Sequence, residues 1–258
     1  MDSISKIGAD FYGCTAGAFP KLRTFRLFRM ESLEEWNTEY SGGGGEGGSH
    51  VLMFPILTLL EVRDSPKLRI KPCLPRGDYY LDIRSCDEVL YYSPLEETCN
   101  VIPEELSYPA PKGLFVYYSE QPLHKWSLLH QYHGFKYLGI EQCSDLTCSS
   151  AETIRGLSSL ETLSVQDSKT ITAVPDWLGD LTSLIRVEIV NCSGIQTLPE
   201  SIQQLTNVEE LIVSGCPDLV RWCKSESSTT LAHIEFKDSG MLVNSLSSND
   251  LFFQEFDN

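Results

Sequence analysis

The sequence predicts an α/β solenoid, an array in which short parallel strands lie side by side and a loop or short helix follows each strand. Three observations predict it. Apolar residues recur in the pattern Leu-x-x-Leu-x-Leu at a nearly constant interval, and a small Cys or Ser follows the pattern at a fixed distance. The chain has 258 residues, of which 41% are hydrophobic, so it can build a continuous core. One such unit has too little apolar surface to be stable alone, and stacking joins the units into one core.

The repeat is clearest in three segments that begin at Leu160, Leu184 and Val208 and align without gaps at intervals of 24 residues. The same frame extends in both directions and gives nine units. The fourth residue of each unit, called the anchor, is Phe25, Leu60, Leu81, Leu114, Leu138, Leu163, Val187, Leu211 or Ile234. Leucine-rich repeats are roughly 20 to 29 residues long, so the pattern predicts leucine-rich repeats in a horseshoe with a parallel concave sheet and an irregular or short-helical convex side.

The spacing of the anchors divides the chain into parts. Residues 1–18 form a lead-in, and residues 19–134 are irregular repeats with insertions, including a Gly-rich loop at 41–49. This loop has no Lys-Ser or Lys-Thr after it, so we interpret it as a flexible loop and not as a phosphate-binding loop. Residues 135–238 are regular repeats of about 24 residues, and residues 239–258 are a C-terminal cap or tail.

A second periodic signal stands five residues after the anchor. The position is small in eight of the nine units. It is occupied by Cys86, Cys143, Cys192 and Cys216, and by Ser65, Ser119, Ser168 and Ser239. Repeats of this kind need a small residue there, because the side chain lies in the turn after the strand and bonds the backbone of neighbouring units.

Composition and charge exclude several classes of protein. The net charge is −16 and no cluster of Lys or Arg occurs, which argues against nucleic acid as a partner. The N-terminal residues lack the features of a secretory signal, and the longest apolar run is too short to cross a membrane. Nine cysteines in a chain of this size do not suggest a disulfide framework. We therefore expect a cytoplasmic protein, with a nucleocytoplasmic distribution as the alternative.

We expect neither metal binding nor catalysis from the His and Cys side chains of this sequence. A zinc site from His130, His133, Cys143 and Cys148 would not match a standard ligand spacing, and Cys143 already has a place in the repeat. A reactive thiol would have to come from the cysteines outside the repeat frame. These are Cys14, Cys73, Cys99, Cys148 and Cys223. We expect no enzyme activity, no metal, no cofactor and no small-molecule substrate.

The concave face of the predicted sheet is the candidate binding surface. Alternation along each strand sends the anchors inward and the residues between them outward. The candidate residues are Arg26, Phe28, Glu61, Arg63, Tyr80, Asp82, Arg84, Phe115, Tyr117, Tyr137, Glu141, Arg186, Glu188, Glu210, His233, Glu235 and Lys237. Arg and Tyr are enriched at interface hot spots. We expect charge reversal at Arg63 or Arg84, or truncation of Tyr80 or Tyr117, to weaken partner binding while changing the stability by no more than about 0.5 kcal/mol.

Two of the regular units carry a more specific motif. Residues 174–184 read V-P-D-W-L-x-x-L-x-x-L, and residues 194–208 read G-I-x-x-L-P-E-S-I-x-x-L-x-x-V. The second resembles the G-I-x-x-L-P-x-S-I-x-x-L-x-x-L pattern of plant intracellular nucleotide-binding leucine-rich-repeat disease-resistance proteins. The resemblance covers nearly the whole chain and is clearest over residues 135–220.

The resemblance implies a region that recognises a pathogen effector or a guarded host protein and that also contacts other domains of the intact receptor. The motif G-x-x-x-x-G-K-[ST] does not occur in the sequence, so ATP or ADP would bind only a nucleotide-binding module that is missing here. We interpret the chain as the C-terminal part of such a receptor or as a truncated gene product. The alternatives are a substrate adaptor of a ubiquitin ligase and an enzyme with a site in residues 86–133.

Overall fold

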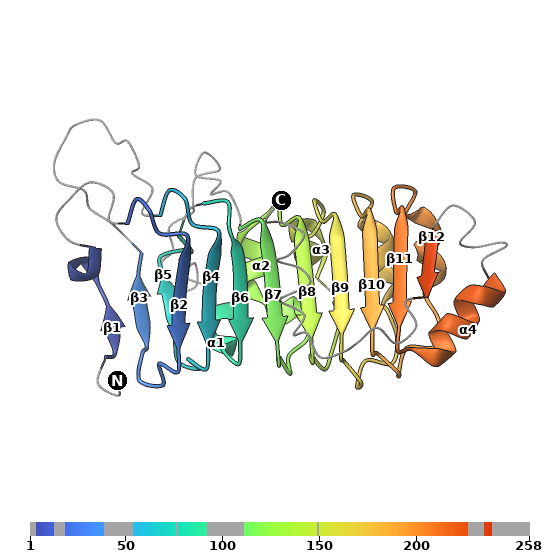
Figure 1. Cartoon of the computed structure of the whole chain (residues 1–258), viewed down its shortest axis with the longest axis horizontal. Helices are drawn as coiled ribbons and strands as arrows, with labels where there is room; N and C mark the ends of the chain where they lie inside the picture. The colour runs from blue at the N-terminus through green and yellow to red at the C-terminus, as the bar shows by residue number, and fades with distance from the viewer. Residues whose placement is uncertain are drawn as a thin grey trace.

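The computed structural model describes residues 4–12, 19–38, 54–75, 77–91, 111–148, 150–226 and 235–238. Its main feature is a sheet of nine parallel strands, which lie in one row with an open order from β12 to β2 (Figure 1). The strands are β2 (Thr24–Phe28), β4 (Leu59–Arg63), β6 (Tyr80–Arg84), β7 (Gly113–Tyr117), β8 (Tyr137–Glu141), β9 (Thr162–Gln166), β10 (Arg186–Val190), β11 (Glu210–Ser214) and β12 (Glu235–Asp238). Within this sheet each strand pairs with the next one along the chain, which is the order of a repeat fold.

The register of the main sheet follows the repeat frame. Each anchor from Phe25 to Leu211 is the second residue of its strand and pairs with the anchor of the neighbouring strand. The second and fourth residues of these strands point into the core and are almost all buried, because successive side chains of a strand point to opposite faces. The arrangement confirms the predicted parallel repeat and is consistent with an α/β solenoid.

The register of the last strand differs from the prediction. Leu211 pairs with Phe236, so Phe236 and not Ile234 takes the anchor position. The predicted anchor was therefore wrong by two residues. A shift of two residues keeps each residue on the same side of the sheet, which is why the alternation in the sequence did not reveal it.

The turn that follows each strand has a common backbone conformation that the sequence analysis did not anticipate. The residue after the strand has a positive φ in eight successive units. These residues are Arg29, Asp64, Ser85, Tyr118, Gln142, Asp167, Asn191 and Gly215. In the first seven, the N–H donates to the carbonyl of the last strand residue of the next unit, at 2.7–3.3 Å. The strained turn is thus retained by one further hydrogen bond between units.

The Cys and Ser positions form the predicted ladder beneath these turns. The Cys216 Sγ accepts from the Cys192 N–H at 3.1 Å and donates to the Ser214 carbonyl at 3.3 Å. The Ser168 Oγ accepts from the Cys143 N–H at 3.2 Å. These side chains are almost fully buried and satisfy backbone groups that would otherwise be desolvated without a partner.

The segments between strands are short helices and 3-10 turns on the core side of the sheet. In Figure 1 the helices α1, α2 and α3 lie behind the row of strands. The elements are α1 (Asp87–Tyr91), η4 (Leu123–Lys125), α2 (Ser127–Gln131), α3 (Ala151–Gly156), η5 (Asp176–Asp180), η6 (Glu200–Gln204) and α4 (Pro217–Glu226). Pro175 and Pro199 precede η5 and η6, where the missing N–H of proline leaves no unsatisfied donor.

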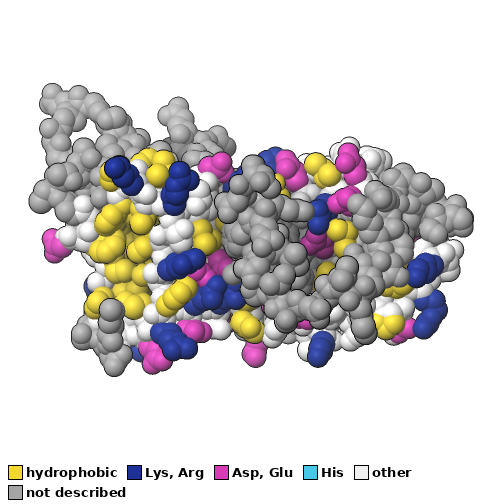
Figure 2. All heavy atoms as spheres, in the orientation of Figure 1, with side chains coloured by type: hydrophobic (Ala, Val, Ile, Leu, Met, Phe, Trp, Pro, Cys, Tyr) yellow, Lys and Arg dark blue, Asp and Glu magenta, His cyan; other side chains and the backbone are white. Residues whose placement is uncertain are grey.

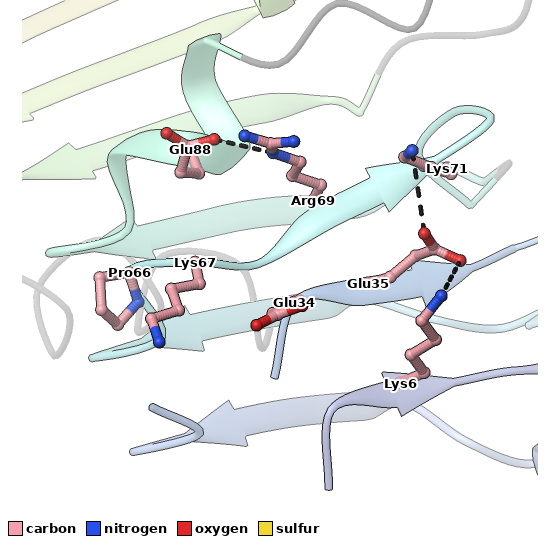
Figure 3. A pocket seen from close by; sticks show the side chains of 8 residues that line it. All are labelled: Lys6, Glu34, Glu35, Pro66, Lys67, Arg69, Lys71 and Glu88. Atoms are coloured by element: carbon pink, nitrogen blue, oxygen red, sulfur yellow. Dashed lines mark hydrogen bonds and ion pairs between the residues drawn. The ribbon is translucent and has the colours of Figure 1, made fainter. Parts of the chain in front are cut away.

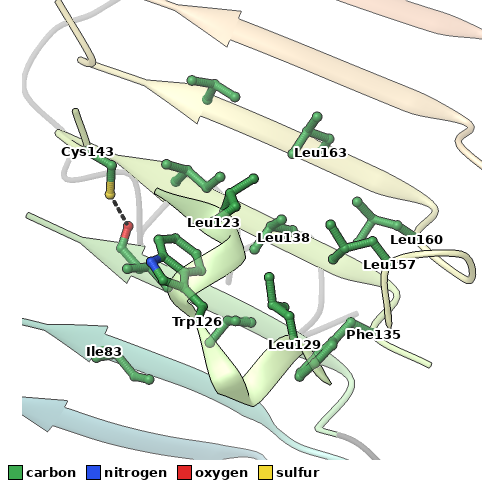
Figure 4. Packing of buried hydrophobic residues seen from close by; sticks show 14 of the residues in the cluster. Ile83, Leu123, Trp126, Leu129, Phe135, Leu138, Cys143, Leu157, Leu160 and Leu163 are labelled. Carbon is green, nitrogen blue, oxygen red and sulfur yellow. Dashed lines mark hydrogen bonds between the residues drawn. The ribbon is translucent and has the colours of Figure 1, made fainter. Parts of the chain in front are cut away.

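The core of the middle units is filled by large side chains from these connections. Trp126 is fully buried and packs with Leu129, Phe135 and Leu138 behind the sheet (Figure 4). At the edge of this cluster the Cys143 thiol points to the Val116 carbonyl, with 3.7 Å between Sγ and the oxygen. The same core extends from Ile7 to Cys223, so the units are joined into one hydrophobic cluster.

A second parallel sheet lies in the N-terminal part of the chain and was missed by the sequence analysis. Its order is β1 (Lys6–Ile7), β3 (Glu35–Asn37) and β5 (Arg69–Lys71). The predicted lead-in therefore contributes a strand, followed by the 3-10 turn η1 (Ala9–Tyr12). Tyr12 Oη donates to the Asn37 carbonyl at 2.7 Å and accepts from Trp36 Nε1 at 2.5 Å. These contacts hold residues 4–12 against the first unit.

Several expectations concern residues outside the described part of the chain. They are the Gly-rich loop 41–49, the C-terminal segment 239–258, Cys14, Cys99, His233 and Ser239. Among the described residues, no helix is long and apolar enough to span a membrane.

The ladder thiols should be unreactive in the folded protein. Burial raises the pKa of Cys86, Cys143 and Cys192 to about 12, and the raised value keeps each thiol neutral at any pH below it. At pH 8 only about one in ten thousand of these groups is a thiolate, the form that attacks a disulfide reagent. We expect peptide mapping after labelling at pH 8 to find them unmodified in the native chain and modified in urea. Labelling of the three at the rate of the half-buried Cys73 would contradict the ladder.

Candidate binding surface

The face of the main sheet opposite the core is called the outer face and consists of the first, third and fifth residues of each strand. Figure 2 views it from the side that faces away from the helices. Fourteen predicted site residues take these positions in β2 to β11, as the alternation requires. They are Arg26, Phe28, Glu61, Arg63, Tyr80, Asp82, Arg84, Phe115, Tyr117, Tyr137, Glu141, Arg186, Glu188 and Glu210. Glu235 and Lys237 pair in register with Glu210 and Ile212, and His233 lies outside the described residues.

The outer face is less exposed than the sequence analysis assumed. Six of the predicted site residues are buried, namely Glu61, Tyr80, Asp82, Phe115, Tyr117 and Glu188. Arg26 and Phe28 are exposed, and the remaining ones in β4 to β11 are half-buried. Residues that lie on a common face of adjacent strands are close enough to pair with each other, so part of the face is occupied by its own contacts.

The carboxylate of Glu61 is the centre of the first group of charges. Arg26 Nε lies 2.8 Å from Glu61 Oε2, and the Arg63 guanidinium pairs with Oε1 from the same strand. The Glu61 side chain is only 3% exposed, whereas that of Arg26 is 57% exposed. A buried carboxylate requires such compensation, because transfer of an unpaired charge from water is very unfavourable.

The second group of charges lies one strand further along. Arg84 binds Asp82 through two hydrogen bonds, from Nε to Oδ1 at 3.0 Å and from Nη2 to Oδ2 at 3.2 Å. The guanidinium also lies over the Tyr117 ring, 3.8 Å from its centroid. The charges of Arg63 and Arg84 therefore compensate buried carboxylates, which argues against the expectation that their reversal leaves the stability unchanged.

Aromatic rings form a cluster on the outer face of the middle strands. Tyr80, Phe115 and Tyr117 are buried there, with Tyr137 packed against them. The Tyr80 ring centroid lies 5.8 Å from that of Phe115 and 5.7 Å from that of Tyr137. Burial raises the pKa of Tyr80 and Tyr117, so both phenols are neutral at physiological pH.

Two glycines of the outer face make room for these rings. A Cβ atom on Gly139 would lie 2.4 Å from Phe115 Cδ1, and one on Gly113 would lie 2.7 Å from Tyr80 Cδ1. The bulky ring on one strand thus lies over the glycine of the next strand. This complementarity between strands was not visible in the alternation of single strands.

The C-terminal half of the outer face has the opposite balance of charge. Arg186 Nη2 lies 2.5 Å from Glu188 Oε1, and Arg186 Nη1 lies 3.4 Å from Glu210 Oε2. Glu141 is a further carboxylate on β8. The outer face over β8 to β11 therefore has one guanidinium and three carboxylates, and two of these pair with Arg186.

A charged pocket of about 390 Å³ lies on the second sheet (Figure 3). Its lining residues are Lys6, Glu34, Glu35, Pro66, Lys67, Arg69, Lys71 and Glu88. Glu35 lies between two lysines, with 3.8 Å to each of Lys6 Nζ and Lys71 Nζ, and Arg69 pairs with Glu88 at 2.9 Å. The sequence signal for this sheet is a short polar–apolar–polar triplet that occurs twice, centred on Trp36 and on Ile70. Trp36 follows the anchor Phe25 by eleven residues, and Ile70 follows the anchor Leu60 by ten.

The side chains considered for metal binding or catalysis have structural contacts. His130 Nε2 lies 2.6 Å from Thr153 Oγ1, and Cys143 belongs to the ladder. The part of the chain that the structure describes contains no group of three His, Cys, Asp or Glu side chains that could hold a metal ion. The thiols of Cys86, Cys143 and Cys192 have a raised pKa, which disfavours the nucleophilic form.

Comparison with known proteins relates part of the chain to plant defence. No family model matches the sequence. The chain is 25% identical over 161 residues to the disease resistance protein RPS4B of Arabidopsis thaliana. The match covers 49% of this chain and 14% of that protein, so the chain spans only a small part of the length of its relative.

Proposed function

We propose that the chain is a leucine-rich-repeat region of a plant disease-resistance protein and recognises a protein ligand in innate immunity. The observation that carries the proposal is the outer face of the regular parallel sheet, on which exposed and half-buried Arg and aromatic side chains lie side by side. The similarity of about half of the chain to a disease resistance protein supports a role in defence.

The repeat chemistry supports the assignment to leucine-rich repeats in a horseshoe. Apolar anchors in register, small Cys or Ser residues in the turns and 3-10 segments on the core side are what such repeats require. Among the described residues, His130 and the cysteines of the ladder are engaged in contacts of the fold, which favours binding over catalysis and a function without a cofactor. The ligand in this proposal is a pathogen effector or a guarded host protein, met in the cytoplasm, and other domains of an intact receptor are further partners.

A genetic complementation experiment tests the proposed function. Plants that lack the protein should lose a pathogen-triggered defence response, and the wild-type chain in its native context should restore it. The Phe28→Ser variant should restore it poorly, because Phe28 is exposed on the outer face. Ile185→Ser is the matched control, since Ile185 is similarly exposed but lies outside the strand positions of the outer face. An unchanged defence response in plants without the protein would refute the proposed function.

A further inference from the structure

The charges of the outer face are distributed unevenly along the array. Over β2, β4 and β6 the outer face has three guanidinium groups, of Arg26, Arg63 and Arg84, and two carboxylates, of Glu61 and Asp82. The net charge of this region is therefore +1 in a chain whose total is −16. Figure 2 shows Lys and Arg side chains next to hydrophobic ones on this half of the face.

Because the two carboxylates are buried, the accessible surface of this region is more positive than its net charge of +1 suggests. The Glu61 and Asp82 side chains are 3% and 1% exposed, whereas those of Arg26 and Arg63 are 57% and 32% exposed. A partner would meet the guanidinium groups first, with the carboxylates beneath them. At physiological ionic strength the screening length is about 8 Å, so distant acidic residues of the chain affect this region little.

Arg63 is not fully compensated by the groups around it, and Arg84 lies beside it. The two residues are register partners on adjacent strands, which lie about 4.8 Å apart. Desolvation by burial and, second to it, the charge of Arg84 lower the pKa of Arg63. Arg63 Nε is buried and has no acceptor among the described residues. Two like charges side by side on a sheet repel each other, and a carboxylate placed between them would relieve the repulsion.

Apolar surface lies next to these guanidinium groups. The Phe28 ring is 45% exposed, and the Arg63 guanidinium lies 5.1 Å from its centroid. A peptide with an apolar side chain beside a carboxylate could therefore contact both groups at once. The C-terminal half of the same face, where Arg186 is surrounded by carboxylates, would repel such a peptide.

We infer that the outer face over β2, β4 and β6 binds an acidic segment of a partner polypeptide, in which Asp or Glu alternates with large apolar residues. Arg26 and Arg63 receive its carboxylates, and Phe28 contacts an apolar side chain. This inference rests on the proposed recognition function and specifies the chemistry of the ligand. It also predicts where the ligand lies, since the acidic half of the face excludes it.

Binding of defined peptides to the full chain tests the inference. The probe is a fluorescein-labelled peptide, Gly-Asp-Phe-Glu-Phe-Asp-Gly, compared with Gly-Asn-Phe-Gln-Phe-Asn-Gly by fluorescence anisotropy. We expect the acidic peptide to bind at least tenfold more tightly and to lose affinity as salt increases. Arg26→Gln and Phe28→Ser should each weaken its binding at least fivefold, whereas Arg186→Gln on the other half should not. Thermal unfolding of each variant establishes that it is folded.

Each other outcome contradicts the inference. If both peptides bind equally, or if neither binds, these guanidinium groups do not select carboxylates. The same conclusion follows if Arg186→Gln weakens peptide binding as much as Arg26→Gln does. Residues 250–257 of the chain itself are acidic and aromatic, so the experiment includes them as the alternative ligand. If the peptide binds only to the Asp250→Asn, Glu255→Gln, Asp257→Asn variant, this segment is the occupant and a partner ligand is refuted. The peptide result does not depend on the defence phenotype, so the two proposals can fail separately.

Discussion

The Leu211→Ala variant is expected to lose about 2 to 5 kcal/mol of its free energy of unfolding. Leu211 is fully buried and is the anchor of β11, paired in register with Val187 on one side and with Phe236 on the other. Its truncation removes apolar contacts and leaves a cavity between stacked units, and neighbouring strands fixed by hydrogen bonds can collapse into it only partly. Urea unfolding followed by circular dichroism measures the loss.

Ile185→Ala is the matched control for this cavity. Ile185 is 41% exposed and precedes β10, so its truncation should change the free energy of unfolding by less than about 0.5 kcal/mol. If both variants lose a similar amount of free energy of unfolding, the position of an aliphatic side chain in the repeat frame does not determine its contribution to stability. Leu163→Ala in β9 should behave like Leu211→Ala, because both anchors lie in the same layer of the core.

The second large effect is expected from Arg84→Ala, which should destabilise the chain by about 3 kcal/mol. The variant removes the two hydrogen bonds that the buried Asp82 carboxylate now accepts. It also removes the guanidinium from the Tyr117 ring. The loss should be measured by urea unfolding at neutral pH.

A double variant separates the buried charge from other effects of the truncation. In Asp82→Ala, Arg84→Ala both charges are removed, and we expect at least half of the lost stability to return, because no uncompensated charge remains. If the double variant is as unstable as Arg84→Ala or less stable, packing of the arginine on Tyr117 and not charge compensation is the main contribution of Arg84.

The parallel sheet could be predicted because the sequence repeats the same local requirement many times. Anchors such as Leu163, Val187 and Leu211 recur at 24 residues, and a small residue follows each of them. One occurrence would be weak, but the recurrence fixes both the strand and its buried side. The prediction was wrong at the last strand. Two apolar residues, Ile234 and Phe236, are two positions apart there, and either fits the anchor position in the sequence pattern.

The second sheet and the charge pairs could not be predicted in this way. The strands β1, β3 and β5 have two or three residues each, too few for a period to be recognised. The assignment of Asp82 and Glu61 to the outer face was correct, but their burial depends on arginines of the same and the neighbouring strand. Long side chains of one strand cover short ones beside them, and this depends on rotamers that no single-strand pattern contains.

The sequence by itself determined which residues of the repeat strands β2 to β11 point into the core and which form the outer face, because an alternation of period two, repeated at a fixed interval, buries all anchors on one side. The tertiary structure decided which outer residues remain accessible. It places Arg63 beside Arg84, covers Asp82 and leaves Phe28 exposed. The physical reason is that the free energy of a charge or an aromatic ring on a sheet depends on its neighbours across strands, which are 21 to 35 residues away in this chain.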